Sequence, residues 1–257
     1  MDFSLTDEQR MFQDLFRDFA QRQVAPLADA LDREERTPIE SIEKAAELEL
    51  LGLPFPAEYG GSGVGFLVQC LLVEELAKAC FSTALTLGVH TGAAGMALYL
   101  GGGETQKKKY LSALARGEVL GAFALSEPWA GSDAASLRTR ASRDGDGYRL
   151  NGEKAYVTNG EIADLFIIYA ATDPQAGARG ISAFIVEKGT PGLKVGQRER
   201  TMGLRGACIN SLTLADCHIP DGNLLGEEGS GFEMVQTVMG MGRLGIAAQC
   251  VGIARAA

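Results

Sequence analysis

The chain has 257 residues, of which 46% are hydrophobic, and it carries a formal net charge of −9. This length is enough for one large domain or two medium domains with a sizeable core. The acidic balance argues against nucleic-acid binding, which would need a basic face.

The first third of the chain is predicted to be helical. Thr6 and Gln9 form a capping box before a run of apolar residues at helical spacing, which are Phe12, Leu15, Phe16 and Phe19. Pro26 is expected to stop this helix. A second helix is expected to begin at Thr37-Pro38, with the proline in the first helical position, and to end at Gly52.

Three more helices are expected at about residues 66–80, 83–99 and 105–116, with Gly117 closing the last one. The most apolar stretch, residues 84–100, contains His90 and several glycines. This composition favours a buried, closely packed helix over a membrane span.

From about Val119 the pattern changes to short strands separated by turn-rich loops. Asn151-Gly152, between two β-prone stretches, is a strong signal for a type I′ hairpin. Further strands are expected at residues 164–171, 181–187, 193–195 and 211–214. We therefore expect an antiparallel β-domain, either a barrel or a sandwich.

The last segment is predicted to be helical again. Ser230 and Glu233 have capping-box spacing, and a helical pattern continues to Ala257. A single helix with an apolar stripe needs partners, so we expect the first helix of a C-terminal bundle. Its stripe is predicted to be exposed until another chain or further residues cover it, and its members are Phe232, Val235, Val238, Met239 and Ile246.

These patterns together predict a multi-domain architecture of α and β units. An all-α N-terminal helical domain is expected over residues 1–118, a middle antiparallel β-barrel or sandwich over 119–228, and the start of the C-terminal helical bundle over 229–257. The cysteines, which are Cys70, Cys80, Cys208, Cys217 and Cys250, lie far apart without a CxxC pair. Disulfides and a metal site are therefore not expected. We expect the protein to be cytoplasmic, where cysteines stay reduced.

Two strand ends carry the most informative residues. The apolar run Phe123-Ala124-Leu125 leads through Ser126 into a polar turn that contains Gly131-Ser132. Such a turn can direct backbone N–H groups at an anion, because glycine tolerates unusual backbone angles. Tyr156-Val157-Thr158 also ends in a hydroxyl and a turn. Alone, the first segment is more typical of an ordinary strand and turn.

Together, these two segments resemble the flavin-binding strands of the acyl-CoA dehydrogenase family. Residues 51–63 resemble the N-terminal loop of that family, and residues 202–206 and 223–232 resemble the end of its β-domain. Residues 242–249 resemble its first C-terminal helix. The resemblance covers the whole chain and gives the individual segments their weight.

The resemblance implies an FAD-dependent enzyme that acts on an acyl-CoA thioester. In the family, a carboxylate removes the α-proton and a hydride passes from the β-carbon to flavin N5, which yields a trans-2-enoyl-CoA. The electrons then pass to an electron-transfer flavoprotein, and the family implies a homo-oligomer, either a dimer or a tetramer. The protein's contribution would be orientation, hydrogen bonds and exclusion of water.

The resemblance also implies roles for individual residues. The cofactor-binding residues would be Phe123, Ala124, Leu125, Ser126, Gly131, Ser132, Tyr156, Val157 and Thr158. Ser126 would contact the edge of the flavin ring, and Thr158 would lie near N5. The substrate-binding residues would be Ser132, Gly240, Met241, Gly242 and Arg243, with Arg243 as the polar contact.

Some positions depart from the family pattern. Trp129, Tyr156 and Gly240 stand where the family often has Gly, Trp and Asp, respectively. The larger departure concerns the general base, because residues 234–257 contain no Asp or Glu, and Gly242 occupies the position that some relatives use. No catalytic residue is therefore assigned, and carboxylates such as Glu127 and Glu233 are not taken as the base.

The sequence leaves three functions open. The first is an acyl-CoA dehydrogenase or the larger part of one, and the second is a flavin oxidase or hydroxylase on the same scaffold. The third is a split, non-catalytic subunit that binds flavin or CoA and needs a partner chain. A hydrolase triad is not supported, since the chain has only two histidines and no GxSxG. His90 is predicted to be a core residue and His218 a loop residue, while Arg205 fits an ion pair or a ligand contact equally well.

Overall fold

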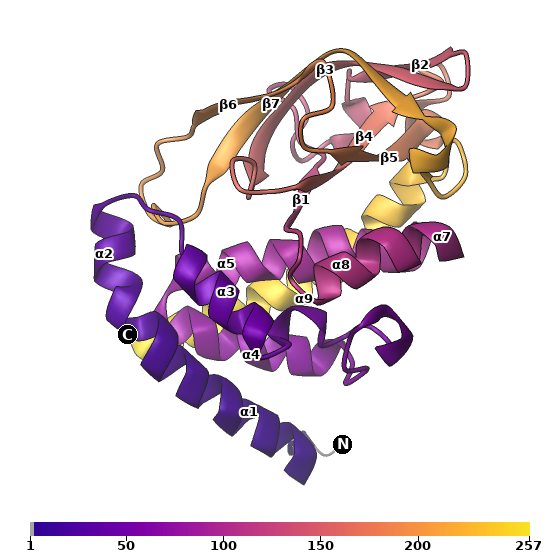
Figure 1. Cartoon of the computed structure of the whole chain (residues 1–257). Coiled ribbons are helices and arrows are strands. Elements are labelled where there is room, and N and C mark those ends of the chain that lie inside the picture. The colour runs from indigo at the N-terminus through magenta and orange to yellow at the C-terminus, as the bar shows by residue number, and fades with distance from the viewer. Residues whose placement is uncertain (1–2) are drawn as a thin grey trace.

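The computed structural model describes residues 3–257, so Met1 and Asp2 of the predicted helical domain lie outside the described part. A layer of helices lies below a β-domain, and the last helix runs from the β-domain along the helical layer (Figure 1). The chain changes from helix to strand between Ala115 and Gly121, and back to helix after Leu225. This order confirms the predicted fold class.

The helical layer contains the helices that the sequence predicts. Their bounds are α1 (Asp7–Phe19), α2 (Ala28–Arg33), α3 (Ile39–Glu47), α4 (Phe66–Ala79), α5 (Phe81–Val89), α6 (Met96–Gly101), α7 (Glu104–Gln106) and α8 (Ser112–Ala115). A π-helical turn at His90–Gly95 joins α5 to α6, and another at Lys107–Leu111 joins α7 to α8. Each pair therefore forms a nearly continuous rod.

The predicted helix ends are partly right. The Thr6 Oγ1 accepts a hydrogen bond from the Gln9 N–H at 3.2 Å, and the Gln9 side chain accepts one from the Thr6 N–H at 3.0 Å, which confirms the capping box. Gly117 also closes α8 as predicted, with a φ of 70°. Pro26 does not stop the helical path, because it lies in the first turn of a 3₁₀ segment, where its missing N–H costs nothing.

Two further ends differ from the prediction. Helix α3 begins one residue later than expected, with Pro38 rather than Thr37 at the N-cap and no capping side chain. It ends at Glu47, and the left-handed residue that follows is Glu49. Gly52 has a packing role instead, since a Cβ there would lie 2.9 Å from the Ala115 carbonyl oxygen.

The β-domain is one sheet with the strand order β6-β7-β3-β2-β4-β5-β8, and β1 pairs with β4 off this path. The strands are β1 (Gly121–Ala124), β2 (Arg140–Asp144), β3 (Gly147–Thr158), β4 (Leu165–Ala171), β5 (Ile181–Glu187), β6 (Leu193–Arg198), β7 (Ile209–Pro220) and β8 (Leu224–Leu225). The sheet is not purely antiparallel, because β1 runs parallel to β4 and β2 meets β4 at a parallel bridge.

The predicted hairpin at Asn151-Gly152 is wrong. The β2–β3 hairpin turns at Gly145-Asp146, and β3 continues straight through Asn151. Gly152 lies at a bulge against β7, where a Cβ would lie only 2.5 Å from the Thr139 Oγ1. His218 is also not in a loop, because β7 extends through it to Pro220.

Both faces of the sheet are buried at β4 and β5. Along β4, Phe166 and Ile168 contact a core inside the β-domain, while Ile167 and Tyr169 contact a second core shared with the helical layer and the last helix. This alternation follows from the two-residue period of a strand. The shared core fixes β1 and β4 against the helices below them.

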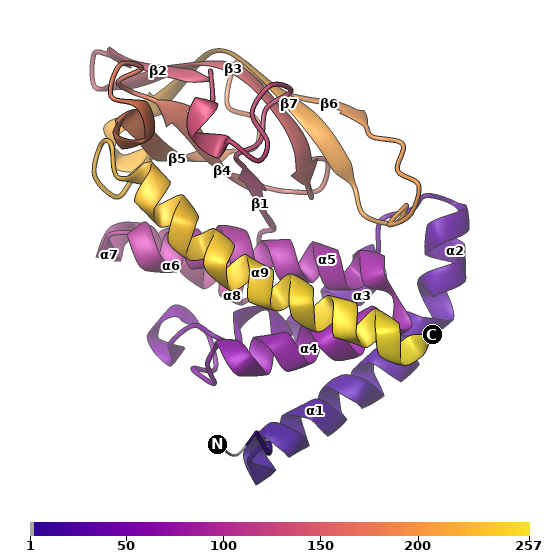
Figure 2. The same ribbon diagram turned by 180° about the vertical axis from the view of Figure 1, so that it is seen from behind.

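The last helix, α9 (Gly231–Ala256), packs along α4, α5 and α6 (Figure 2). Its start is as predicted, but the capping box is absent because the Ser230 Oγ donates to the Glu227 carbonyl instead. The predicted exposed stripe is largely wrong, since Val235 and Val238 are buried and only Ile246 of its members is exposed. The large apolar side chains that are exposed on α9 are Leu244, Ile246, Val251 and Ile253.

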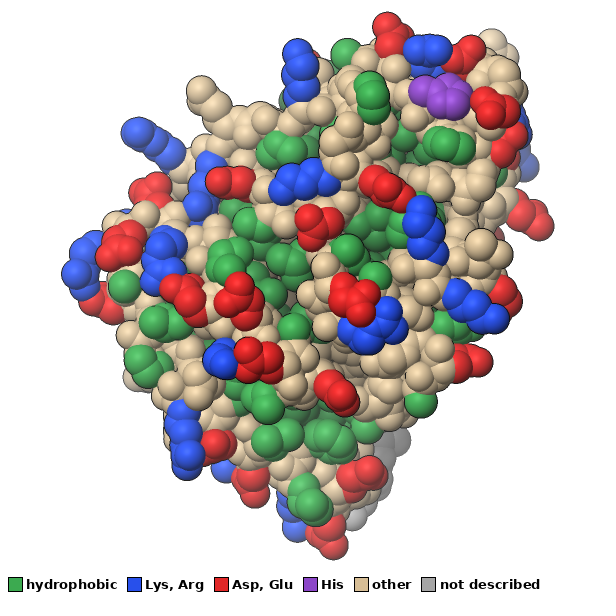
Figure 3. Space-filling view, in the orientation of Figure 1, with side chains coloured by type: hydrophobic (Ala, Val, Ile, Leu, Met, Phe, Trp, Pro, Cys, Tyr) green, Lys and Arg blue, Asp and Glu red, His purple; other side chains and the backbone are tan. Residues whose placement is uncertain are grey.

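By length and composition alone, α9 is the one helix among residues 3–257 that could cross a membrane. This is weak evidence, because a core helix of a globular domain can pass the same test. Its inner side contacts the helical layer and its outer side is bare on this chain. On the opposite face of the molecule, acidic and basic side chains are intermingled rather than gathered by sign (Figure 3).

A candidate flavin and acyl site between the β-domain and the helices

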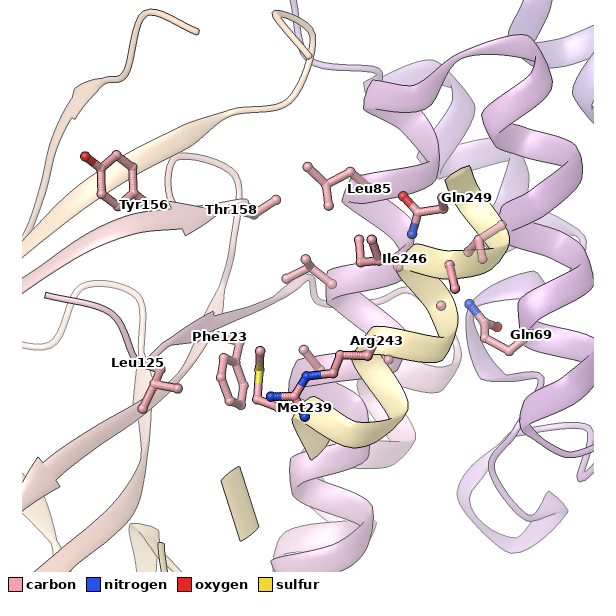
Figure 4. A pocket seen from close by; sticks show the side chains of 18 of the residues that line it. Gln69, Leu85, Phe123, Leu125, Tyr156, Thr158, Met239, Arg243, Ile246 and Gln249 are labelled. Atoms are coloured by element: carbon pink, nitrogen blue, oxygen red, sulfur yellow. The ribbon is translucent and has the colours of Figure 1, made fainter. Parts of the chain in front are cut away.

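A cavity of about 530 Å³ lies where β1, β3, α4, α5 and α9 meet. Figure 4 shows Phe123, Leu125 and Thr158 on its β-domain side and Arg243 and Ile246 on its α9 side. The wall is mostly apolar, and Arg243 is the one charged residue among the described residues that line it. A largely apolar cavity with a few polar groups is the usual form of a small-molecule site.

The predicted cofactor residues divide according to the strand period. Phe123, Leu125 and Ser126 line the cavity, and so do Tyr156 and Thr158. The residues between them do not. Ala124 and Val157 point to the other face of the sheet and are packed in the β-domain core, so their side chains do not line the cavity. Their assignment as cofactor-binding residues stays a prediction.

The remaining predicted positions divide in a similar way. Gly131 and Ser132 lie in an exposed turn that is outside the cavity lining. On α9, Gly242 and Arg243 line the cavity, but Gly240 and Met241 do not. A helix shows only part of its circumference to one cavity, so four consecutive residues cannot all face it.

A buried ion pair fixes the loop that follows β1. The Lys154 Nζ lies 2.8 Å from the Glu127 Oε1, and both side chains are fully buried. Lys154 also donates to the Leu125 carbonyl at 3.1 Å, and the Ala155 N–H donates to the Ser126 carbonyl at 2.9 Å. The two cavity-lining strand ends are therefore held to each other through Lys154 and its neighbour.

Glu127 is committed to this structural role. Its carboxylate also accepts hydrogen bonds from the Arg138 and Thr139 N–H groups and from the Trp129 indole at 2.6–3.0 Å. Burial alone would raise the pKa of Glu127, but Lys154 and these donors outweigh it and hold the pKa below its usual value. Burial lowers the pKa of Lys154 to about 8, against the opposing effect of Glu127. A carboxylate held in this way is not free to act as a general base.

His90 joins the helical layer to the start of β1. The Gly121 N–H donates to the His90 Nδ1 at 3.1 Å, so the ring proton is on Nε2 and is donated to the Leu114 carbonyl at 3.1 Å. The ring is buried, and burial lowers its pKa to about 4. The prediction of a satisfied core histidine is confirmed.

Tyr156 has an unusual backbone at the mouth of the cavity. Its φ is 56°, and it lies in a bulge of β3 between the pairs Lys154–Leu212 and Val157–Asn210. Bulges of this kind redirect side chains and are common beside functional sites. Here the bulge leaves the Tyr156 ring 69% exposed while its neighbour Val157 is buried.

The hydroxyls of Ser126 and Thr158 suit the polar edge of a flavin. Both face the cavity, and within residues 3–257 neither side chain has a hydrogen-bond partner. Phe123 and Leu125 offer apolar surface beside them. A flat ring with an apolar face and hydrogen-bonding edge fits this combination of residues.

No carboxylate faces this cavity among the described residues. Its lining contains no Asp or Glu, and Glu233 lies instead beside a separate groove with Met234 and Thr237. Arg205 forms an ion pair with Asp32 of α2, which decides its open assignment in favour of a structural role. The described lining of the cavity thus offers hydroxyl, amide, guanidinium and apolar groups to a ligand.

The sequence reasoning missed the helical wall of the cavity. Its residues come from α4, α5, the π-turn and α9, and include Phe66, Gln69, Val73, Leu85, Gly88, Val89, Gly92, Ala93, Met239, Gly245, Ile246, Ala247 and Gln249. The available signal was the small residues of α5 and the π-turn, which we attributed to close packing alone. In the structure, Gly88 and Gly92 leave room for the cavity as well.

Comparison with known proteins identifies the family. The model of the acyl-CoA dehydrogenase N-terminal domain matches residues 6–118, and the model of the middle domain matches residues 122–217. The chain belongs to the acyl-CoA dehydrogenase family. Members of this family are FAD-dependent oxidoreductases.

Individual relatives agree with this assignment. The chain is 43% identical to the short-chain specific acyl-CoA dehydrogenase of Clostridium acetobutylicum, over 100% of this chain and 68% of that protein. It is similar to butyryl-CoA dehydrogenase from Megasphaera elsdenii, with a TM-score of 0.96 and 42% identity over 100% of this chain and 68% of the other. The FAD complex of PigA has a TM-score of 0.93 and 34% identity, over 98% and 67% of the two chains. The chain thus spans about 67–68% of these relatives.

Proposed function

We propose that this acyl-CoA dehydrogenase family chain forms the flavin- and acyl-binding part of an FAD-dependent dehydrogenase. The reaction is α,β-dehydrogenation of an acyl-CoA thioester to a trans-2-enoyl-CoA. The observation that carries the proposal is the cavity at the junction of the β-domain and the helices. There the free hydroxyls of Ser126 and Thr158, the apolar side chains of Phe123 and Leu125, and Arg243 surround one space.

The residues of this chain would bind the cofactor, bind the acyl-CoA and exclude water. When bound, FAD supplies the acceptor for the hydride that leaves the acyl β-carbon. Ser126 and Thr158 hydrogen-bond the polar edge of the ring, and Phe123 packs against its apolar surface. The helical wall orients the acyl group and excludes water, while Arg243 attracts the anionic CoA part. Such positioning is a large part of the catalytic effect of many enzymes.

We further propose that the general base is not one of the described residues. The support is that no carboxylate lines the cavity and that Glu127 is held by Lys154 and backbone donors. A general base typically contributes roughly 10²–10⁴-fold to the rate. These residues alone would then bind FAD and acyl-CoA but reduce the flavin slowly.

A visible spectrum of the purified protein tests the cofactor proposal. We expect a yellow protein, or one that becomes yellow when reconstituted with FAD, and a spectral change when an acyl-CoA is added without oxygen. A colourless protein that does not take up FAD would refute the proposal. Rapid reoxidation by O₂ alone would instead favour an oxidase or hydroxylase on the same scaffold.

Gly242→Glu tests the proposal about the base. A Cβ at Gly242 meets no atom within 4 Å, and the position faces the cavity, so a new carboxylate has room there. We expect anaerobic flavin bleaching by acyl-CoA to accelerate roughly 10²-fold. Gly240→Glu is the matched control, because its Cβ is equally free but the residue does not line the cavity. Fast bleaching by the unmodified chain would mean that one of its own carboxylates is the base.

The outer side of α9 favours a second candidate, a split subunit that is completed by a partner chain. Leu244, Val251 and Ile253 are exposed on that side, and exposed apolar surface of this kind is typical of interfaces. If α9 instead packs against a second copy of this chain, the assembly is a homo-oligomer, and native mass spectrometry distinguishes it from a hetero-complex.

We also propose a cytoplasmic location, which is supported by five free cysteines. The proposed electron acceptor is an electron-transfer flavoprotein, on the basis of the family resemblance.

A further inference from the structure

The helical end of the cavity carries two buried amides with polar atoms that are unpaired within residues 3–257. Gln69 of α4 and Gln249 of α9 line the cavity on the side away from Tyr156 and Thr158 (Figure 4). Each side chain is only 2% exposed. Gln69 Nε2, Gln69 Oε1 and Gln249 Oε1 are all buried and have no hydrogen-bond partner within residues 3–257.

Such groups are unfavourable unless something binds to them. A buried donor or acceptor that loses water and gains no partner destabilises the fold. Leucine has nearly the same size as glutamine and would complete an otherwise apolar wall formed by Phe66, Val73, Leu85 and Ile246. Two amides at this place therefore indicate that the space between them receives a polar group.

The location of the amides relates them to one part of the substrate. Under the proposed function, on which this inference rests, the reacting α- and β-carbons lie at the strand ends beside Ser126 and Thr158. The far end of the acyl group then extends away from the β-domain, toward α4 and α9. Gln69 and Gln249 would contact that distal end and not the thioester.

The chemistry of the wall favours a neutral group over a charged one. Two of the three atoms without a hydrogen-bond partner within residues 3–257 are amide carbonyl oxygens, which would repel a carboxylate. No Lys or Arg among the described lining residues accompanies Gln69 and Gln249 at this end. A hydroxyl both donates and accepts, so it can satisfy the amide oxygens and the amide N–H of Gln69. We propose that this chain selects acyl-CoA substrates with a hydroxyl group at the distal end of a short acyl chain.

Binding of matched CoA thioesters to the FAD-loaded protein tests this proposal. γ-Hydroxybutanoyl-CoA and pentanoyl-CoA differ only by a hydroxyl in place of a terminal methyl, and titration calorimetry or the flavin spectrum gives their dissociation constants. We expect the hydroxy compound to bind about tenfold more tightly, which is the effect of one or two satisfied hydrogen bonds. In Gln69→Leu and Gln249→Leu the preference should fall to about one or reverse in favour of pentanoyl-CoA.

Two controls separate recognition from general damage. Leu85→Met changes the apolar wall of the same cavity and should keep the preference for the hydroxyl. The melting temperature of ligand-free Gln69→Leu should be equal to or above that of the unmodified protein, because the change removes two unsatisfied buried atoms. A variant that simply failed to fold would lower it.

The outcomes distinguish this proposal from the function on which it rests. If pentanoyl-CoA binds as tightly as the hydroxy compound to the unmodified protein, the inference is wrong, but the proposed function stands. Tighter binding of a thioester with a distal carboxylate also overturns it, since a neutral group is then not what the amides select. If neither thioester binds, both the inference and the proposed function are refuted.

Discussion

The buried imidazole of His90 predicts a specific dependence of stability on pH. Burial lowers its pKa from 6.5 to about 4, so below pH 6.5 the unfolded chain takes up a proton that the folded protein does not. The free energy of unfolding therefore falls as the pH drops through this window. The loss is about 2 kcal/mol at about pH 5 and reaches about 3 kcal/mol near pH 4, at about 1.4 kcal/mol for each unit of pKa difference.

The geometry explains why the ring stays neutral. Its Nδ1 accepts from Gly121 and its Nε2 donates to Leu114, so a second ring proton would break the bond to the first residue of β1. That strand leads directly to Phe123 and Leu125 in the cavity. Protonation of His90 would thus loosen the cavity-forming strand as well as destabilise the fold.

Urea unfolding at a series of pH values between about 5 and 8 measures this effect. His90→Gln should be less stable at neutral pH but should lose most of the pH dependence in that range. The matched control is His218→Gln, since His218 is the other histidine of the chain, and its side chain is 40% exposed and lies 3.5 Å from Asp146. If His90→Gln keeps the slope of the unmodified protein, or if His218→Gln removes it, the assignment to His90 is wrong.

Three further changes test the remaining parts of the structure. Glu127→Gln should lower the free energy of unfolding in urea by about 3–5 kcal/mol, because it leaves Lys154 buried without its charged partner. The control Glu153→Gln, at an exposed position next to Lys154, should change this free energy little. Equal effects of the two variants would contradict the structural role of the pair. Thr158→Val should shift the flavin potential and weaken FAD binding by about 1 kcal/mol, which is the contribution of one hydrogen bond. The melting temperature of the FAD-free protein should not change. If FAD binding and the flavin potential are both unchanged, the hydroxyl does not contact the ring. Val238→Ala should lower the free energy of unfolding by about 2 kcal/mol, because the side chain is buried in the shared core. Leu244→Ala, at a position that is 60% exposed, should lower it far less. The reverse order would mean that α9 packs its other side against the helical layer.

The sequence predicts the order of the elements better than their ends. Periodicity locates α1 and α9, because apolar residues recur at helical spacing along both segments. Local signals fail where a tertiary contact takes over the residue, as with Ser230, whose hydroxyl binds the Glu227 carbonyl instead of capping α9. Pro26 is a similar case, because a π-helical turn at Ala20–Val24 and the 3₁₀ turn at Ala25–Leu27 let the helical path continue into α2.

The hairpin error has a definite physical origin. Asn-Gly is a strong turn signal, but Gly145-Asp146 offers a competing tight turn six residues earlier, and that turn pairs Asp144 with Gly147. Gly152 is required for another reason, since its backbone passes too close to Thr139 for any side chain. A single sequence carries no sign of that contact, which joins β3 to the residue that precedes β2.

The candidate site shows the same limit more sharply. Its β-domain side could be predicted, because the hydroxyl and apolar residues lie on two short, recognisable strand ends. The two-residue period of a strand then explains why Phe123 and Leu125 face the cavity while Ala124 does not. The helical side could not, because Gln69 and Gln249 are 180 residues apart in the chain and become neighbours of one cavity only when α9 packs against α4. In sequence each is an ordinary glutamine on a helix. Only the fold buries both amides and leaves three of their four polar atoms unpaired within residues 3–257. This burial is the reason that these two residues indicate what the substrate carries at its distal end.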